Sequence, residues 1–281
     1  MTERLAETTR RIGSVHALSD VVTAMRGISA SRVQQAHGLL EGVRAYEKVI
    51  ANAIGQALPL LPEIEHPPHA PDRQAVIVFC AEQGFAGAFS DRVLDTAAAE
   101  VAQGWDMFLI GTRGAALARD RGMQPFWQAA MVPHASLISN LAGRIADALY
   151  AWVAGRAGSR LEMIVPHWKA GEGVTAERRS LLPFDFRRFA SPLAAQAPLI
   201  TLPPWLLLVR LAEEYIFSEL CEAALSAFSA ENEARVAIML SAKAHLDSML
   251  SDLQASERQI RQEEITAEVV ELASSSAVPS R

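Results

Sequence analysis

The chain has 281 residues, half of them hydrophobic, and a formal net charge of −6. No segment is rich enough in basic residues to predict nucleic acid as a partner. Two cysteines, Cys80 and Cys221, are too few for a disulfide framework and suit a reducing compartment. The N-terminus lacks the apolar core of a signal peptide, and the longest apolar run, Pro198 to Val209, is too short to span a bilayer. Any membrane association is therefore expected to come through partners.

Residues 1–58 contain no proline and show apolar residues at a spacing of three and four from Val15 onward. This spacing predicts one continuous helix of about 80 Å with a single narrow apolar seam. The predicted seam consists of Val15, Leu18, Val22, Met25, Ser29, Arg32, Ala36, Leu39, Val43, Tyr46, Ile50, Ala53 and Ala57.

Residues 59–71 hold five prolines and predict a stiff connector that ends this helix. Residues 72–204 then alternate short apolar runs with helical patterns, which predicts an open, partly parallel α/β domain. The expected elements are a strand at 75–80, a helix at 91–103, a strand at 107–110, a short helix ending at 121, a helix at 134–154 and a hairpin from 161–166 and 174–181.

The glycine loop from Gly84 to Gly87 follows a strand and precedes a helix, which is the setting of many phosphate-binding loops. Its spacing matches neither the P-loop nor the dinucleotide fingerprint, so we interpret it as a structural turn. His66 and His69 in the connector, like the isolated His134, His167 and His245, lack neighbours at metal-ligand spacing. The sequence predicts no catalytic residue, no metal and no cofactor.

Residues 205–281 form a second proline-poor segment, with Trp205 to Val278 free of proline and a seam of the same kind. That seam is predicted at Met239, Ala242, Leu246, Met249, Leu253, Ser256, Ile260, Glu263, Ala267 and Val270. Residues 1–58 carry a net charge of +2 and residues 205–281 a net charge of −7. Opposite charge and matching seams predict an antiparallel coiled coil of the two terminal helices. The alternative is that two separate amphipathic helices lie on a globular core.

The C-terminal helix is the longer of the two, so its end is expected to run past the N-terminus of its partner. This overhang, from about Glu264 to Val278, carries Ile265, Val269 and Leu272. An apolar stripe on a single helix is unfavourable in water. We therefore expect another protein to sheathe this tip.

Several motifs resemble the gamma subunit of F-type ATP synthases, over essentially the whole chain. Arg10–Val15 and Val22–Ala30 look like the opening helix of that family, and Glu82–Ser90 is similar to its Asp-Arg-Gly loop. Glu231–Arg235 with Met239 resembles the Ser-Glu-x-Ala-x-Arg-Met segment, and Arg261–Leu272 resembles the family's ending. Glu82, Gln83, Glu233 and Ser275 depart from the usual residues, which suggests a divergent or alternate bacterial form.

The resemblance implies a rotary mechanism. The coiled coil would stand in a hexamer of alpha and beta subunits as the central rotor shaft, and the α/β domain would form a foot beside the epsilon subunit and the membrane c-ring. It implies contacts with the beta and alpha subunits at Met25, Arg235, Gln262, Thr266 and Glu268. It also implies that the chain itself is not catalytic and lies at the cytoplasmic face of the bacterial inner membrane.

Two other classes of function stay open at this point. One is an α/β nucleotide-binding enzyme with helical dimerisation arms, which nucleotide binding by the isolated chain would support. The other is a non-rotary coiled-coil scaffold, which would form a dimer without further partners. The expected division is 1–58 shaft helix, 59–71 connector, 72–204 foot domain and 205–281 shaft helix and tip.

Overall fold

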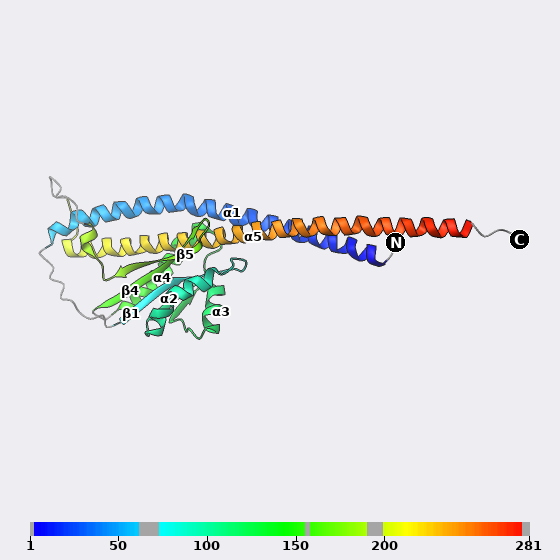
Figure 1. The fold of residues 1–281 in the computed structure, drawn as a ribbon. Helices are drawn as coiled ribbons and strands as arrows, with labels where there is room; N and C mark the ends of the chain where they lie inside the picture. The colour runs from blue at the N-terminus through cyan, green and yellow to red at the C-terminus, as the bar shows by residue number, and fades with distance from the viewer. Residues whose placement is uncertain (1–2, 62–72, 155–157, 190–198, 277–281) are drawn as a thin grey trace. The chain divides into compact units, whose positions relative to one another are not determined.

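The structure is a computed structural model that describes residues 3–61, 73–154, 158–189 and 199–276. The predicted connector lies largely outside these residues, as do His66 and His69. The chain forms two compact units, one of Ser29–Arg235 and one of Met1–Ile28 with Val236–Arg281. Two long helices, α1 (Glu3–Ala57) and α5 (Pro204–Ser276), run through both units, as the sequence predicts (Figure 1).

The Ser29–Arg235 unit is built on a five-stranded sheet of order β3-β2-β1-β4-β5. The strands are β1 (Arg73–Phe79), β2 (Asp106–Ile110), β3 (Trp127–Ala129), β4 (Ser159–Lys169) and β5 (Gly173–Leu182). β1 pairs in parallel with β2 and β4, β2 pairs in parallel with β3, and β4 and β5 form an antiparallel hairpin. The predicted partly parallel sheet is confirmed, and β3 is a strand that the sequence pattern did not predict.

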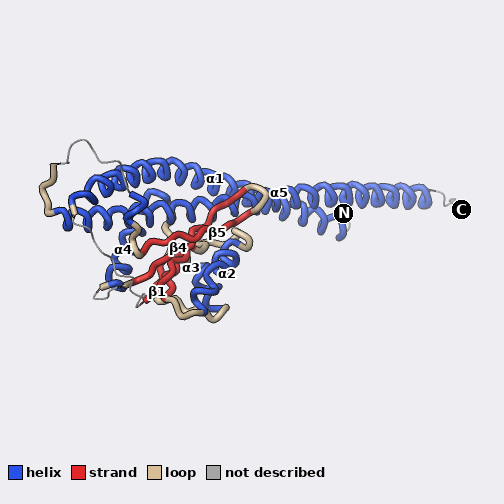
Figure 2. Tube along the Cα trace, turned by 60° about the vertical axis from the view of Figure 1, so that its left-hand side comes forward, coloured by secondary structure: helices blue, strands red, loops and turns tan. Residues whose placement is uncertain are grey.

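Helices cover both faces of the sheet, so β1 buries side chains on both sides. Ile77 and Phe79 face a cluster that includes α4 (Ile138–Val153) and α5, whereas Val76 and Val78 face α2 (Phe89–Ala102) and α3 (Thr112–Asp120). Short 3-10 turns lie at Leu58–Leu60, Ala135–Leu137 and Phe186–Phe189. Figure 2 shows the strands between the α-helices of this unit.

Within this unit α5 is a central element of the core. Every residue from Ser218 to Asn232 is buried. On one side α5 meets α1, through the ion pair of Arg44 with Glu222 (2.9 Å) and the hydrogen bond of Tyr215 with Glu47 (3.1 Å). On its other sides it meets the sheet and α4. A seam two positions in seven wide describes this stretch of α5 poorly, because it is covered all round.

The other unit contains only the paired ends of α1 and α5. Val22 packs with Met239 and Leu246, and the Lys243 ammonium donates to Ser19 Oγ (2.8 Å). Since lower residue numbers on α1 meet higher numbers on α5, the pairing is antiparallel, as predicted.

The seam differs from the prediction in one of its two lines of residues. One line is buried or half-buried throughout: Val22, Ser29, Ala36, Ile50 and Ala57 are buried, and Val15 and Val43 are half-buried. The second line is wrong at Leu18, Leu39 and Tyr46, which are 51%, 41% and 42% exposed, while its other members Met25, Arg32 and Ala53 are half-buried. Ser19, Val33, Leu40 and Ile54, each one residue after a predicted position, are buried instead. A helix brings both i+3 and i+4 close to position i, so spacing alone does not choose between the two lines.

Candidate functional site

Three of the four predicted partner-contact residues of α5 lie near its exposed C-terminal end. Gln262, Thr266 and Glu268 are all exposed, and Thr266 Oγ1 donates to the Gln262 carbonyl oxygen at 2.8 Å. Gln262 and Thr266 are four residues apart and share one helix face, whereas Glu268 is two residues further on and points to another side. The structure therefore brings two of these three side chains together.

Met25 is half-buried on α1 and packs against the cluster of Val22, Met239 and Leu246. Its thioether thus contributes to the seam between the helices. A flexible, polarisable side chain suits such an irregular contact.

The predicted tip is exposed and apolar. Ile265, Val269 and Leu272 are 56%, 59% and 68% exposed, and Ile260 is the last buried residue of α5 among those whose side chains are described. Figures 1 and 2 both show α5 running past the N-terminal end of α1. The overhang expected from the helix lengths is therefore present.

Arg235 is buried, with only 3% of its surface exposed. Its guanidinium donates from Nε to the Gly84 carbonyl oxygen (3.1 Å), from Nη1 to Asn232 Oδ1 (3.0 Å) and from Nη2 to Glu231 Oε1 (2.5 Å). In this structure the guanidinium is thus held by internal acceptors, and contact with another subunit would require these hydrogen bonds to be exchanged.

Glu231 joins α5 to the loop that follows β1. Its two carboxylate oxygens accept from the backbone N–H groups of Glu82 (3.0 Å) and Gln83 (3.1 Å). The carboxylate is almost fully buried, and its charge is balanced by Arg235. The loop reaches this shape through a left-handed conformation at Phe85 (φ 62°) and at Gly87 (φ 60°).

Glu82 carries the connection onward to the neighbouring strands. Its carboxylate accepts from the Thr112 N–H (2.9 Å), the Thr112 hydroxyl (2.7 Å) and the Met131 N–H (2.9 Å). Thr112 follows β2 and Met131 follows β3, so one carboxylate links the carboxyl ends of three parallel strands. We refer to Glu82, Thr112, Met131, Glu231, Asn232 and Arg235 as the loop clamp.

The loop clamp occupies two of the backbone N–H donors of this glycine loop. In open α/β sheets, ligands bind at the carboxyl ends of the strands where the strand order reverses, and here that position follows β1, between β2 and β4. The N–H groups that could cradle a phosphate instead hold the Glu231 carboxylate. The internal Glu231 carboxylate thus takes two donors that a bound phosphate could otherwise use.

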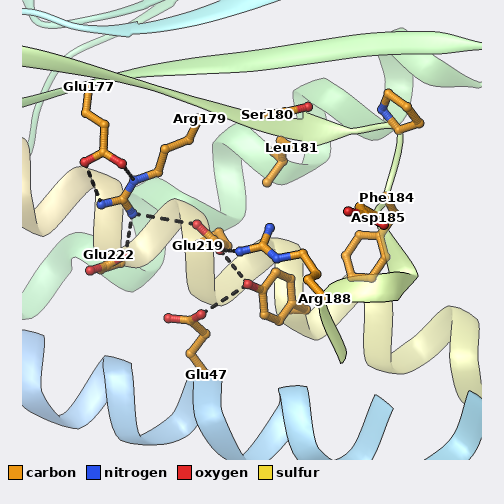
Figure 3. A pocket seen from close by; sticks show the side chains of 12 residues that line it. Glu47, Glu177, Arg179, Ser180, Leu181, Phe184, Asp185, Arg188, Glu219 and Glu222 are labelled. Carbon is orange, nitrogen blue, oxygen red and sulfur yellow. Dashed lines mark hydrogen bonds and ion pairs between the residues drawn. The ribbon is translucent and has the colours of Figure 1, made fainter. Parts of the chain in front are cut away.

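A polar pocket of about 580 Å³ lies elsewhere in the same unit, where β5 and the 3-10 turn at Phe186–Phe189 meet α1 and α5 (Figure 3). Arg179 lies between Glu177 and Glu222, with Nη1 2.6 Å from Glu222 Oε2. The Tyr215 hydroxyl lies between Glu219 (2.7 Å) and Glu47 (3.1 Å). The pocket thus holds ion pairs and hydrogen bonds that join β5, α1 and α5.

Cys80 and Cys221 are buried, and burial raises the pKa of their thiols to about 12 and about 11. Among the described residues no cluster of three or more His, Cys, Asp or Glu is arranged to hold a metal ion. None of the described helices combines the length and apolarity that a membrane crossing requires.

Sequence reasoning identified both halves of the loop clamp as motifs but not their contact. The available signal was Glu231 directly after the small and apolar stretch 223–230, together with a glycine loop rich in N–H donors. A buried carboxylate needs such donors, so the two features could have been matched.

Known proteins resemble the chain over nearly its whole length. The family model described as ATP synthase matches residues 4–278. The ATP synthase gamma chain of Clavibacter michiganensis is 25% identical, and the alignment covers 97% of this chain and 96% of that protein. The ATP synthase gamma chain of Frankia casuarinae is 27% identical with the same coverage.

Solved structures share the fold. A chain of the Euglena gracilis mitochondrial ATP synthase (OSCP/F1/c-ring) superposes with a TM-score of 0.67 at 8% identity, covering 99% of this chain and 97% of that one. A chain of the Tetrahymena thermophila mitochondrial ATP synthase central stalk and c-ring gives a TM-score of 0.57 at 15% identity, covering 79% and 99%.

The ATP synthase chains of these structures share with this chain a fold of two long antiparallel helices and a small α/β unit. The ATP synthase family model matches the sequence over residues 4–278. The chain belongs to the gamma-subunit family of the F-type ATP synthases.

Proposed function

We propose that this chain is the central rotor shaft of an F-type ATP synthase, coupling ion flow through a membrane ring to ATP synthesis or hydrolysis. The observation that carries the proposal is the antiparallel pair of helices whose longer member ends in an exposed apolar tip. Such a tip is suited to a sleeve made by other subunits. The chain itself forms no bond in the reaction and acts by mechanical contact.

The partners we propose are the alpha and beta subunits around the helices, and the epsilon subunit and c-ring beside the α/β domain. Gln262, Thr266 and Glu268 are exposed polar groups suited to contacts with alpha and beta. Met25 and Arg235 stay predictions as contact residues. The predicted division into shaft helices, connector and foot is part of the same proposal.

The placement we propose is peripheral, at the cytoplasmic face of a bacterial inner membrane. Attachment through the c-ring would account for a membrane location without a spanning helix.

Co-purification from native membranes tests the proposal directly. Tagged chain should recover alpha and beta subunits, with ATP hydrolysis in the eluate. Vesicles carrying the complex should take up ions when ATP is added, and ionophores should abolish the gradient. Recovery of the chain alone as a stable folded dimer would instead support a non-rotary scaffold.

A further inference from the structure

The core stretch of α5 is lined by small residues. Its buried side chains include Ala223, Ala224, Ser226, Ala227, Ser229, Ala230 and Ala234. Burial of apolar surface resists separation of a helix from its neighbours, but it is non-directional. The larger buried side chains Leu220, Leu225 and Phe228 all lie before Ser229. From Ser229 to Arg235 the buried apolar residues are Ala230 and Ala234, whose short side chains do little to block rotation of the helix about its axis.

Directional contacts must therefore fix the rotation of α5 against the sheet, and the loop clamp supplies them. Two backbone N–H groups, at Glu82 and Gln83, grip the Glu231 carboxylate, and the Gly84 carbonyl oxygen accepts from Arg235. The side chains of Glu231 and Arg235 are only 5% and 4% exposed, so water weakens these charge-assisted bonds little.

Hydrogen bonds also hold the other side of the loop. Glu82 ties it to Thr112 and Met131, behind β2 and β3. A force on the sheet can thus reach α5 through hydrogen bonds alone, by way of Glu82, the loop backbone and Glu231.

The place of the clamp along α5 is the second argument. Arg235 is the last residue of the Ser29–Arg235 unit, and beyond it α5 continues as one helix to Ser276. A second charged link, from Glu222 to Arg44 and Arg179, lies about two and a half turns earlier. The loop clamp is thus the last polar connection before the helix leaves the α/β unit.

We propose that the Glu231–Arg235 pair, held by the loop at Glu82–Gly84, is the torque-bearing contact that fixes α5 to the α/β domain. This inference rests on the proposed rotor function. It makes Glu231 and Glu82 positioning residues for coupling, with no contact to nucleotide.

The test compares Glu231→Gln with wild type in the full complex reconstituted into vesicles. Because the Glu222 link remains, we expect the variant chain to fold and assemble. It should hydrolyse ATP at the wild-type rate but move fewer ions per ATP. Amide hydrogen exchange at Glu82 and Gln83 should accelerate about ten- to a hundredfold, as loss of a charged hydrogen bond implies. Glu231→Asp, which keeps the charge, should recover part of the coupling.

A buried glutamate outside the clamp provides the control. Glu100 on α2 is 6% exposed and pairs with Arg178 (2.5 Å), and Glu100→Gln should leave ions moved per ATP unchanged. Wild-type coupling in Glu231→Gln, with faster exchange of the loop amides, would overturn the inference. If that variant does not accumulate, Glu82→Gln decides in the same assay. Failure of the wild-type chain to support ATP-driven transport would count against the rotor function itself.

Discussion

In the polar pocket, the hydrogen bonds of the Tyr215 hydroxyl bear on whether Glu47 carries a proton. It lies within hydrogen-bonding distance of both Glu47 and Glu219 but has one proton to donate. When it donates to Glu219, a bond with Glu47 requires the proton to sit on Glu47. Burial and the nearby negative charge of Glu219 raise the pKa of Glu47, in agreement with a proton on Glu47.

Glu47→Gln tests this arrangement. A raised pKa in the folded chain means that protonation of Glu47 stabilises folding. That stability is fully present below the ordinary pKa of 4.5 and is lost as pH rises through the folded value. Glutamine mimics the protonated acid, so the variant should gain free energy of unfolding over wild type as pH rises above 4.5. Urea unfolding at a series of pH values measures the difference.

The groups that face Glu47 are Tyr215, Glu219, Glu222 and Arg188, and both proteins carry all of them. Their titration therefore largely cancels in the comparison. Glu41→Gln, at an exposed position of the same helix, should show no such pH-dependent gain. If the difference in the free energy of unfolding between Glu47→Gln and wild type did not change with pH, it would contradict a proton on Glu47.

Gly114 is required because α3 approaches β1 closely. A Cβ at this position would lie 2.0 Å from the Cβ of Cys80 and 2.8 Å from its Sγ. Gly114→Ala should therefore destabilise the chain by about 1–3 kcal/mol, the usual cost of overpacking. Gly143 in α4 has nothing within 4 Å of the same atom. There, alanine should stabilise by about 0.5–1 kcal/mol, because it favours the helix. Chemical denaturation of the two variants should give opposite signs.

At the scale of elements, the coiled-coil seam offers a matched pair of adjacent leucines. Leu40 is 8% exposed in the core cluster, whereas Leu39 is 41% exposed. Leu40→Ala should cost about 2–5 kcal/mol and Leu39→Ala less than about 1 kcal/mol. Thermal or urea unfolding distinguishes them. If the two variants lost equal free energy of unfolding, or if Leu39→Ala lost more, the result would support the seam first predicted from the spacing.

The elements themselves were largely predictable because long periodic patterns dominate this chain. α1 (Glu3–Ala57) and, after its first residue, α5 (Pro204–Ser276) lie in the two proline-free segments from which long helices were predicted. The strand β3 escaped prediction because three residues, Trp127–Ala129, carry no periodicity. The burial of the core stretch of α5 was not predicted, because alanine and serine occur both on exposed helix faces and in closely packed cores.

The candidate site was predictable only in part. The tip residues Ile265 and Val269 follow from helix lengths, which need no tertiary information. The burial of Arg235 does not, because its partner Gly84 is 151 residues away in the sequence. A long-range polar contact leaves no periodic trace, so resemblance marked the two segments without showing that they meet.

At the scale of the whole molecule, a substitution in the exposed tip should affect binding to other subunits without affecting the stability of the chain itself. Val269 is 59% exposed on the overhang and Val49 is 62% exposed on α1. Serine at either position should change the free energy of unfolding by less than about 0.5 kcal/mol, because neither side chain is buried in the isolated chain.

In the assembled enzyme the two positions should differ. If a sleeve buries Val269, serine there forfeits about 1 kcal/mol of apolar burial and weakens binding to the alpha and beta subunits about fivefold. Val49→Ser should bind as wild type, because it lies outside the overhang. Titration of alpha–beta complexes with labelled chain measures both affinities. Equal affinities would mean that the overhang stays in water, and that the shaft is held by its paired region alone.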